Sequence, residues 1–449
     1  MSDFAFSSEG GSNSADLRRR LAALDAEALE PPDDTSRDLQ RQLRSRVLEE
    51  AGTRIPRALP DDEREQRIRQ LVDEIIELDD IRVSPTQRRS IIRQVVSDTV
   101  GYGPLDELMT DDRVSEIMCN GPDTIYVERS GRIERTDLAF GDEAHLRSVI
   151  NRIARSAGRR IDESSPMVDA RMADGSRMNA ILPPLALNGP VLTIRRFPEV
   201  RLTPESLVAA GTYTMDLIGF VDACVRAKLN IVVSGGTSTG KTTALNVLSQ
   251  FIDDRERIIT IEDSAELSLR QPHVISLEAR PPNTEGEGRV TIRELLVNAL
   301  RMRPDRLIIG ECRGGEALDM LQAMNTGHEG SMTTVHANSP RDALRRLETM
   351  VLMAGYDLPL RAIREQMSSI IHLILQLDRA PDGRRIVRSL AEVQHMEDDT
   401  ILVQDLFVHD LDTGRPMRTG LRPGFQPLLD RAGVADPARP GGVDSKAVR

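Results

Sequence analysis

The sequence predicts an α/β protein with three parts: an N-terminal three-helix region, a small α+β domain and a larger doubly wound core. Three observations predict this order. Residues 36–102 carry apolar residues at helical spacing, and residues 103–197 carry short strands separated by turns. Between residue 214 and about residue 335, helices alternate with aliphatic strands. A chain of 449 residues has room for two or three domains, each with its own core.

The composition and charge argue against a nucleic-acid-binding protein, and the sequence argues against a secreted or membrane-spanning one. The chain has 59 basic and 71 acidic residues and a net charge of −12, so it is a poor general partner for nucleic acid. It has no tryptophan and only 3% aromatic residues, which leaves few platforms on which bases could stack. The N-terminus lacks the basic and apolar regions of a secretory signal, and no aliphatic run approaches the ~20 residues that span a bilayer. We therefore expect a cytoplasmic protein whose membrane association, if any, is peripheral.

The three cysteines, Cys119, Cys224 and Cys312, lie far apart, and none has the spacing of a metal site. Each is flanked by apolar or mixed sequence. We expect small buried side chains in a reducing compartment.

Residues 1–35 are rich in Ser, Gly, Asp and Glu and are predicted to form a mostly disordered tail. Residues 36–102 are predicted to form three helices. The second has an apolar stripe at helical spacing, made of Ile68, Leu71, Val72, Ile75 and Ile76. The third opens with the capping sequence Ser84-Pro85-Thr86-Gln87. A region of this size buries little surface alone, so we expect it to dock on another domain or a partner.

The α+β domain over residues 103–197 is predicted from short strands and one helix. The strands are expected at residues 114–118, 124–127, 132–136, 177–182 and 191–196. The helix is expected at about residues 142–157. Residues 198–213 are predicted to be a linker.

Residues 214–412 are predicted to form the doubly wound core. Its strands are expected at residues 230–234, 257–261, 273–277, 306–309 and 331–335. Most are aliphatic throughout, as in strands that helices cover on both faces. Helices at residues 341–353 and 360–368 and strands at residues 371–377 and 384–393 close the domain. Residues 413–449 are rich in Pro, Gly and Arg and are predicted to form a flexible tail.

One stretch of the core fits the phosphate-binding pattern G-x-x-x-x-G-K-[ST] at every fixed position. It consists of Gly235, Gly236, Thr237, Ser238, Thr239, Gly240, Lys241 and Thr242, followed by Thr243. It lies between an aliphatic run and a predicted helix, which is the context that the motif requires. Loop amides and the helix N-terminus would hold phosphate, Lys241 would reach the β- and γ-phosphates, and Thr242 would ligate Mg²⁺. The sequence therefore predicts binding of a nucleoside triphosphate, ATP, with Mg²⁺.

Two acidic sites follow strands of the core, where ligand chemistry gathers in sheets of this kind. One is Glu262-Asp263, and the other is Glu311 after Gly310. We expect Glu311 to be the base that activates water, rather than a solvated turn residue. Many phosphate-loop enzymes have an aspartate where this chain has Gly310. Mg²⁺ is therefore expected to use Thr242, phosphate oxygens and water, with Glu262 and Glu311 acting through water.

Two histidines, His328 and His336, flank the predicted strand at residues 331–335. As a metal pair they lack further ligands at usable spacing. Their Gly, Ser and Thr neighbours and their place one element after Glu311 predict a sensor of the γ-phosphate, although each alone could be an ordinary core or turn histidine.

Arginines stabilise the negative charge that spreads over a transferred phosphoryl group. Six candidates stand out: Arg171, Arg177, Arg195 and Arg196 in the α+β domain, and Arg301 and Arg303 in the core. For any one of them, a surface ion pair is the more common explanation.

Together these motifs resemble those of the secretion ATPases of type II secretion, type IV secretion and type IV pili. The residues that carry the resemblance occur in the family's order: the phosphate loop, Glu262-Asp263, and segments 120–123, 174–177, 300–305, 310–316 and 327–340. The resemblance runs from about residue 36 to 420 and is greatest for the CpaF/TadA branch, which powers the Tad (Flp) pilus. Glycine at position 310 is usual in that family.

The resemblance implies a RecA-like core in a homohexameric ring, with nucleotide between the α+β domain and the core. It also implies a motor that docks on the cytoplasmic face of an inner-membrane platform protein. By motif position, Glu311 corresponds to the family's catalytic glutamate, Glu262 to its acidic box, and His328 and His336 to its histidine box. Arg177, Arg195 and Arg196 correspond to basic positions that approach the nucleotide.

We therefore predict an ATP-hydrolysing motor that assembles a Tad-type pilus, with retraction left open. The nearest alternative is a type IV secretion system ATPase. A RecA-like nucleic-acid motor is disfavoured by the acidic charge and the scarcity of aromatic residues. A nucleotide-binding scaffold without turnover is disfavoured by the intact Lys241 and Glu311.

Overall fold

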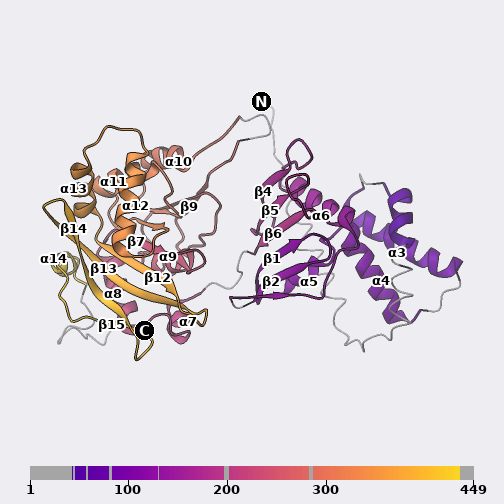
Figure 1. Cartoon of the computed structure of the whole chain (residues 1–449), viewed down its shortest axis with the longest axis horizontal. Coiled ribbons are helices and arrows are strands. Elements are labelled where there is room, and N and C mark those ends of the chain that lie inside the picture. The colour runs from indigo at the N-terminus through magenta and orange to yellow at the C-terminus, as the bar shows by residue number, and fades with distance from the viewer. Residues whose placement is uncertain are drawn as a thin grey trace. The chain divides into compact units, whose positions relative to one another are not determined.

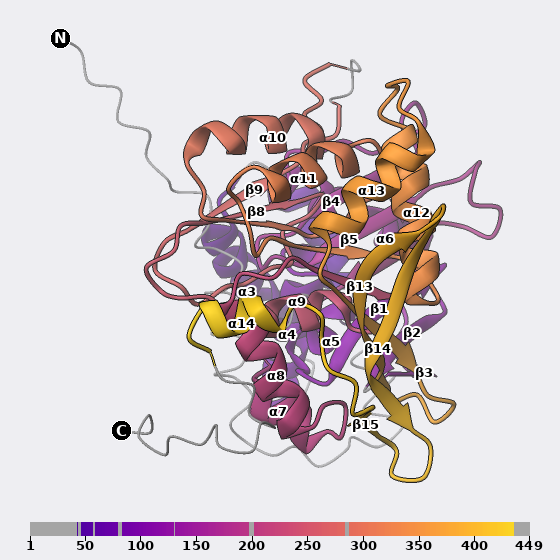
Figure 2. The same ribbon diagram turned by 90° about the vertical axis from the view of Figure 1, so that its left-hand side faces the viewer.

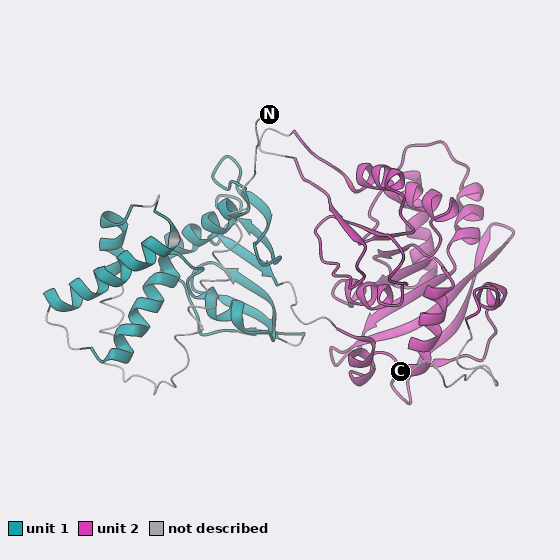
Figure 3. Ribbon diagram, turned by 180° about the vertical axis from the view of Figure 1, so that it is seen from behind, with its two compact units in different colours: residues 1–199 teal, residues 200–449 magenta. Residues whose placement is uncertain are grey.

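The computed structural model describes residues 43, 46–56, 59–79, 83–129, 131–196, 202–282 and 287–434. They belong to two compact units, Met1–Glu199 and Val200–Arg449 (Figure 3). The predicted tail at residues 1–35 lies outside the described residues.

Helices open the first unit. Residues 46–54, α3 (Asp61–Leu78) and α4 (Pro85–Thr99) are helical, and α5 (Leu105–Thr110) leads into the sheet. The apolar stripe of α3 packs against α4, and Ile68, Val72 and Ile75 are fully buried. At the start of α4, Gln87 N donates to Ser84 Oγ at 3.1 Å, and Ser84 N donates to Gln87 Oε1 at 2.7 Å. This is the capping box that the sequence predicts.

A six-stranded antiparallel sheet completes the first unit (Figure 1). Its order is β3-β2-β1-β6-β5-β4. The strands are β1 (Val114–Asn120), β2 (Ile125–Arg129), β3 (Arg132–Arg135), β4 (Met167–Arg171), β5 (Arg177–Ile181) and β6 (Val191–Arg195). Helix α6 (Glu143–Ser156) packs on the sheet through Leu146, Val149, Ile150 and Ile153, which are fully buried.

The second unit contains a nine-stranded mixed sheet in the order β15-β14-β13-β12-β7-β11-β10-β8-β9. The run from β12 to β9 is parallel, and β13, β14 and β15 continue it with antiparallel pairing. The parallel strands are β7 (Ile231–Gly235), β8 (Ile258–Glu262), β9 (Val274–Glu278), β10 (Arg306–Ile309), β11 (Met332–Val335) and β12 (Leu373–Arg379). The others are β13 (Arg385–Glu397), β14 (Thr400–Asp410) and β15 (Arg415–Arg418).

Helices cover both faces of this sheet (Figure 2). On one face lie α8 (Met215–Arg226), α9 (Lys241–Ser249) and α14 (Gln426–Arg431). On the other lie α10 (Ile292–Ala299), which the 3₁₀ turn η1 (Leu300–Met302) follows, α11 (Glu316–Asn325), α12 (Pro340–Leu352) and α13 (Leu360–Ile370). Alternate residues of the parallel strands enter the two cores, so Ile231 and Val233 face the first and Val232 faces the second. The predicted doubly wound α/β fold is therefore confirmed.

Two segments contain more structure than the sequence predicts. Within the predicted C-terminal tail, β15 pairs with β14, and Phe425 and Leu429 are buried beside α8. Two apolar side chains anchor this Pro- and Gly-rich segment, which is why composition misled the prediction; residues 435–449 lie outside the described residues. The predicted linker contains α7 (Pro204–Ala209), whose Leu207 is buried. In the described part of the chain, no helix combines the length and apolar character needed to cross a membrane.

Candidate active site

The predicted phosphate loop curls between the buried strand β7 and the N-terminus of α9. Gly240 has φ +93°, and Ser238, also left-handed, has φ +59°. A Cβ at Gly235 would lie 2.5 Å from Thr239 Oγ1 and 2.8 Å from the Leu377 carbonyl oxygen. The loop therefore requires glycine at both ends, at Gly235 because a side chain has no space and at Gly240 because of the backbone conformation.

Lys241, the first residue of α9, is 8% exposed and lies over the loop. Its ammonium group donates to the carbonyl of Gly235 at 3.1 Å and to that of Gly236 at 2.7 Å. Beside it, Thr242 Oγ1 donates to Glu266 Oε2 at 3.3 Å. A hydroxyl and a carboxylate are oxygen ligands of the kind that Mg²⁺ prefers, so these residues fit the predicted metal.

Glu311 and His336 meet beside Lys241. β10 and β11 are adjacent parallel strands, so the residues that follow them share the sheet edge at which β7 enters the phosphate loop. His336 Nε2 lies 3.2 Å from Glu311 Oε1, and His336 Nδ1 lies 3.4 Å from Lys241 Nζ. Burial, and then the charge of Lys241, lowers the pKa of His336. A neutral ring that accepts from Lys241 at Nδ1 donates from Nε2 to Glu311.

Arg313 is a site residue that the sequence analysis missed. Its guanidinium donates to Glu311 Oε2 at 2.8 Å and lies 3.3 Å from Asp263 Oδ2. It thus links the two predicted acidic sites and binds the Glu311 carboxylate oxygen that His336 does not contact. The only signal was its position two residues after Glu311, which by itself does not separate it from a surface arginine.

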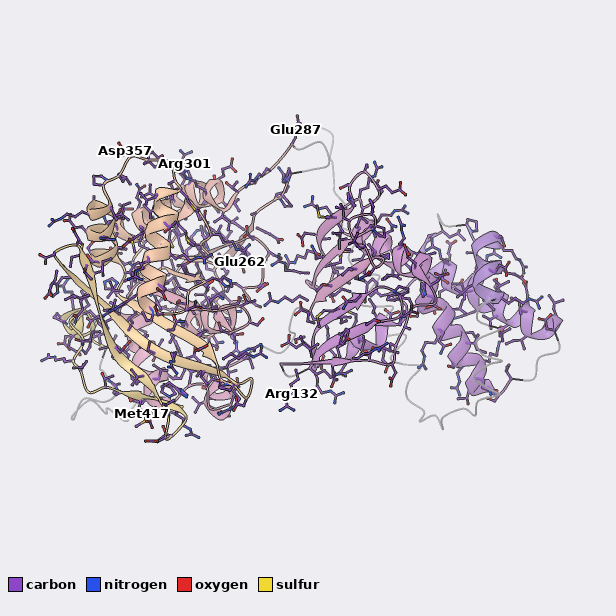
Figure 4. All side chains as sticks on the ribbon, viewed as in Figure 1. Arg132, Glu262, Glu287, Arg301, Asp357 and Met417 are labelled. Carbon is purple, nitrogen blue, oxygen red and sulfur yellow. The ribbon has the colours of Figure 1, made fainter. Side chains whose placement is uncertain are left out.

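Glu262, labelled in Figure 4, is the last residue of β8. Its exposed fraction is 3%. Its Oε1 accepts from the backbone amides of Glu266 at 2.9 Å and Leu267 at 3.0 Å. Its Oε2 is buried and has no hydrogen-bond partner within the described ranges. Burial raises the pKa of Glu262 to about 7. A Cβ at residue 310 would lie 2.8 Å from Glu262 Cγ, which explains in steric terms why glycine precedes Glu311.

The raised pKa predicts how stability depends on pH. The folded protein holds the Glu262 proton more tightly than the unfolded chain, whose pKa is about 4.5. The stabilisation is therefore complete below about pH 4.5 and is lost as the pH rises through about 7, a total of about 3 kcal/mol. Glu262→Gln cannot ionise, so its Tm should fall less than that of the wild type between pH 5 and pH 8. Differential scanning calorimetry without nucleotide measures this.

Glu397→Gln is the control for that experiment. Glu397 is likewise the last residue of a strand, β13, but is exposed. Its Tm should follow the wild-type curve with pH. A Glu262→Gln curve parallel to both would show that the Glu262 proton is bound equally in the folded and unfolded states.

The structure does not bring His328 to this edge. His328 precedes β11 whereas His336 follows it, so the two histidines lie at opposite edges of the sheet. His328 Nδ1 lies 2.9 Å from the Pro304 carbonyl oxygen, just before β10. The predicted sensing role therefore has a geometric basis for His336 alone.

A buried arginine occupies that opposite edge. Arg306 is 1% exposed and pairs with Glu256 at 2.7 and 3.0 Å. It also donates to the carbonyls of Gly330 at 3.0 Å and Val225 at 2.9 Å. A Cβ at Gly330 would lie 1.6 Å from the Arg306 guanidinium. Gly330, two residues after His328, thus makes space for the buried guanidinium of Arg306.

Three of the predicted arginines form a row in the first unit. Arg171 pairs in register with Arg177, and Arg177 with Arg195, across β4, β5 and β6. Residues opposite one another share a face of a sheet, so the three side chains project together. Arg196 instead donates within its own unit to the carbonyls of Asp111 and Val114. In the second unit, Arg301 is exposed (Figure 4), and Arg303 is exposed with φ +57°.

A family model described as "Type II/IV secretion system protein" matches residues 98–405. The chain belongs to this family. The match includes every site residue described above and leaves out α3 and nearly all of α4. The predicted relation to the secretion ATPases is thereby confirmed.

This member of the secretion family is similar to proteins of conjugal transfer and of type IV secretion. The chain is 36% identical to the "Putative conjugal transfer protein Rv3659c" of Mycobacterium tuberculosis, over 68% of this chain and 88% of that protein. It is 32% identical to the "Conjugal transfer protein TrbB" of Rhizobium radiobacter, over 70% of this chain and 93% of that protein. The VirB11 ATPase of the Brucella suis type IV secretion system, solved with sulphate, is 30% identical with a TM-score of 0.37, covering 64% of this chain and 92% of that chain.

Proposed function

We propose that this chain is an ATP-hydrolysing motor of a type IV secretion machine. The observation that carries the proposal is the meeting of Lys241, His336 and Glu311 at the edge where β7 enters the phosphate loop. Each follows a different strand of the sheet, β7, β10 or β11, and together they supply a phosphate-binding cation, a neutral imidazole and a carboxylate base. A phosphate-binding cation and a carboxylate base are groups that phosphoryl transfer to water uses.

The residues divide the chemistry among them. Lys241 would exchange its loop carbonyls for phosphate oxygens, and the α9 N-terminus would hold the β-phosphate. Mg²⁺ bound with ATP would neutralise phosphate charge, held by Thr242 and, through water, by Glu266. Glu311 would take the proton of the attacking water while Arg313 fixes its carboxylate. His336 would report the γ-phosphate, because it touches both Lys241 and Glu311.

The relatives favour export over pilus assembly. Several of them are described as conjugal transfer or type IV secretion proteins, and they match about two thirds of this chain. The Tad pilus motor is the second candidate. It is favoured by α3 and all but the last two residues of α4, which lie outside the family match and which resemble an accessory helical region of the Tad branch.

The same proposal includes a homohexamer that works at the inner face of the cytoplasmic membrane through platform proteins. Its support is the row formed by Arg171, Arg177 and Arg195, which is suited to a nucleotide phosphate. Within the sheet, Glu116 of β1 stands opposite Arg195 and offsets part of this positive charge.

Purified protein tests the motor. We expect ATP turnover, and hexamers in sedimentation with a non-hydrolysable analogue, for the wild type, and neither for Lys241→Ala. Turnover stimulated by DNA with a steep salt dependence would indicate a nucleic-acid motor instead, and binding without turnover would indicate a scaffold. Deleting the gene distinguishes the two candidate functions. Loss of export with intact pili would support a secretion motor, and loss of pili would support a Tad pilus motor.

A further inference from the structure

Arg385, the first residue of β13, touches the phosphate loop from outside. Its Nε donates to the carbonyl oxygen of Ser238 at 3.3 Å. Its Cδ lies 3.2 Å from where a Cβ of Gly240 would be. The contact joins residues 147 positions apart in the sequence and belongs to none of the motifs described above.

The β12–β13 hairpin holds Arg385 in this place. Arg385 pairs in register with Arg379 of β12, and its carbonyl accepts from Thr212 Oγ1 at 3.0 Å. β12 is also the parallel neighbour of β7. At the start of the loop, the carbonyl of Leu377 lies 2.8 Å from the Cβ position of Gly235. One hairpin therefore borders the phosphate loop at both its ends.

The part of the loop that Arg385 contacts has the least favourable backbone. Ser238 has φ +59° although it carries a side chain, and an L-residue adopts such a conformation only at an energetic cost. A hydrogen bond to the Ser238 carbonyl favours this conformation, in which successive amides can face an anion. The exposed guanidinium also adds a positive charge beside the place where nucleotide phosphates would bind.

We propose that Arg385 is a positioning residue for nucleotide binding. It holds the Ser238–Gly240 turn in its anion-binding conformation and raises the local positive potential. Both effects act on any nucleotide with a β-phosphate, so Arg385 contributes to the affinity for ADP as well as ATP and little to the chemical step. The inference rests on the proposed ATPase function but concerns binding alone.

Arg384 provides a matched control. It is the adjacent arginine and is exposed, but its Nε donates to Asp382 at 2.6 Å, at the tip of the hairpin. Removing Arg384 takes the same charge from the same hairpin without touching the loop. A difference between Arg385→Ala and Arg384→Ala therefore reports the loop contact.

The experiment measures the Kd of a fluorescent ADP analogue and of its ATP counterpart. Arg385→Ala should weaken both about tenfold, equivalent to about 1.4 kcal/mol, and should leave kcat within about twofold of the wild type. Arg384→Ala should bind like the wild type. Arg385→Lys keeps the positive charge but replaces the guanidinium with a less suitable hydrogen-bond donor. Its Kd values should lie between those of Arg385→Ala and the wild type. The salt dependence of the ADP Kd should be shallower for Arg385→Ala than for Arg384→Ala.

Two results would overturn the inference. Equal Kd values for Arg385→Ala and Arg384→Ala would exclude the loop contact as a source of affinity. A lowered Tm with unchanged salt dependence would make Arg385 a purely structural residue. Because ADP binding needs no hydrolysis, a wild type that binds ADP but does not turn over ATP would contradict the proposed motor and leave this test valid.

Discussion

Glu311→Gln should lower the kcat for ATP by about 10³-fold and leave the Kd for ATP within a few-fold of the wild type. The amide keeps the size of the side chain but cannot take a proton from water. His336 and Arg313 both contact the Glu311 carboxylate, at 3.2 and 2.8 Å. They hold it in place and do not themselves supply a base, because the arginine is always charged and the imidazole donates from the nitrogen that faces Glu311. Single-turnover hydrolysis and equilibrium nucleotide binding measure the two quantities separately.

Glu329→Gln is the control for this substitution. Glu329 is exposed and lies next to His328, away from the phosphate loop. The same chemical change there should leave both kcat and Kd unchanged. If Glu311→Gln kept more than a tenth of wild-type turnover, another group would have to be the base, and the proposed division of roles would fail.

The sequence predicted those site residues that lie at or shortly after the end of a strand of the core. A phosphate loop needs a strand before it and a helix after it, and acidic residues after aliphatic strands collect at one edge of a parallel sheet. That reasoning brings Glu262, Glu311 and Lys241 together without any structure. It fails for His328 because two histidines on either side of a strand cannot share an edge. The four residues of β11 separate them by roughly 13 Å.

Other features depend on contacts between distant segments, which no local pattern encodes. Arg385 reaches the loop because β12 pairs with β7 and then turns back into β13. In the sequence, Gly310 stands out only as a replacement for aspartate, and Gly330 is an ordinary turn glycine. In the structure each makes room for a particular side chain, Glu262 beside Gly310 and Arg306 beside Gly330. Sequence reasoning finds such glycines, but only the packed structure says what they face.

The second large effect concerns stability. Arg306→Leu should destabilise the second unit by about 3–5 kcal/mol, because it removes one partner of a buried ion pair. Arg306 has four hydrogen bonds, two to Glu256 and two to backbone carbonyls, and is 1% exposed. Burial alone would raise the pKa of Glu256, but Arg306 and Lys228 hold it below its usual value. Leucine would leave that carboxylate with Lys228 alone and the carbonyls of Gly330 and Val225 without this donor.

Urea denaturation measures the loss, with Arg301→Leu as the control. Arg301 is exposed on the turn that leads to β10 (Figure 4), so the same substitution there should change the free energy of unfolding by less than about 0.5 kcal/mol. The double variant Arg306→Leu with Glu256→Gln separates two causes of the effect. If the uncompensated charge of Glu256 dominates, the double variant should recover part of the stability. If the lost hydrogen bonds to the carbonyls dominate, it should be no more stable than Arg306→Leu, because Glu256→Gln does not replace the Arg306 donors to Val225 and Gly330.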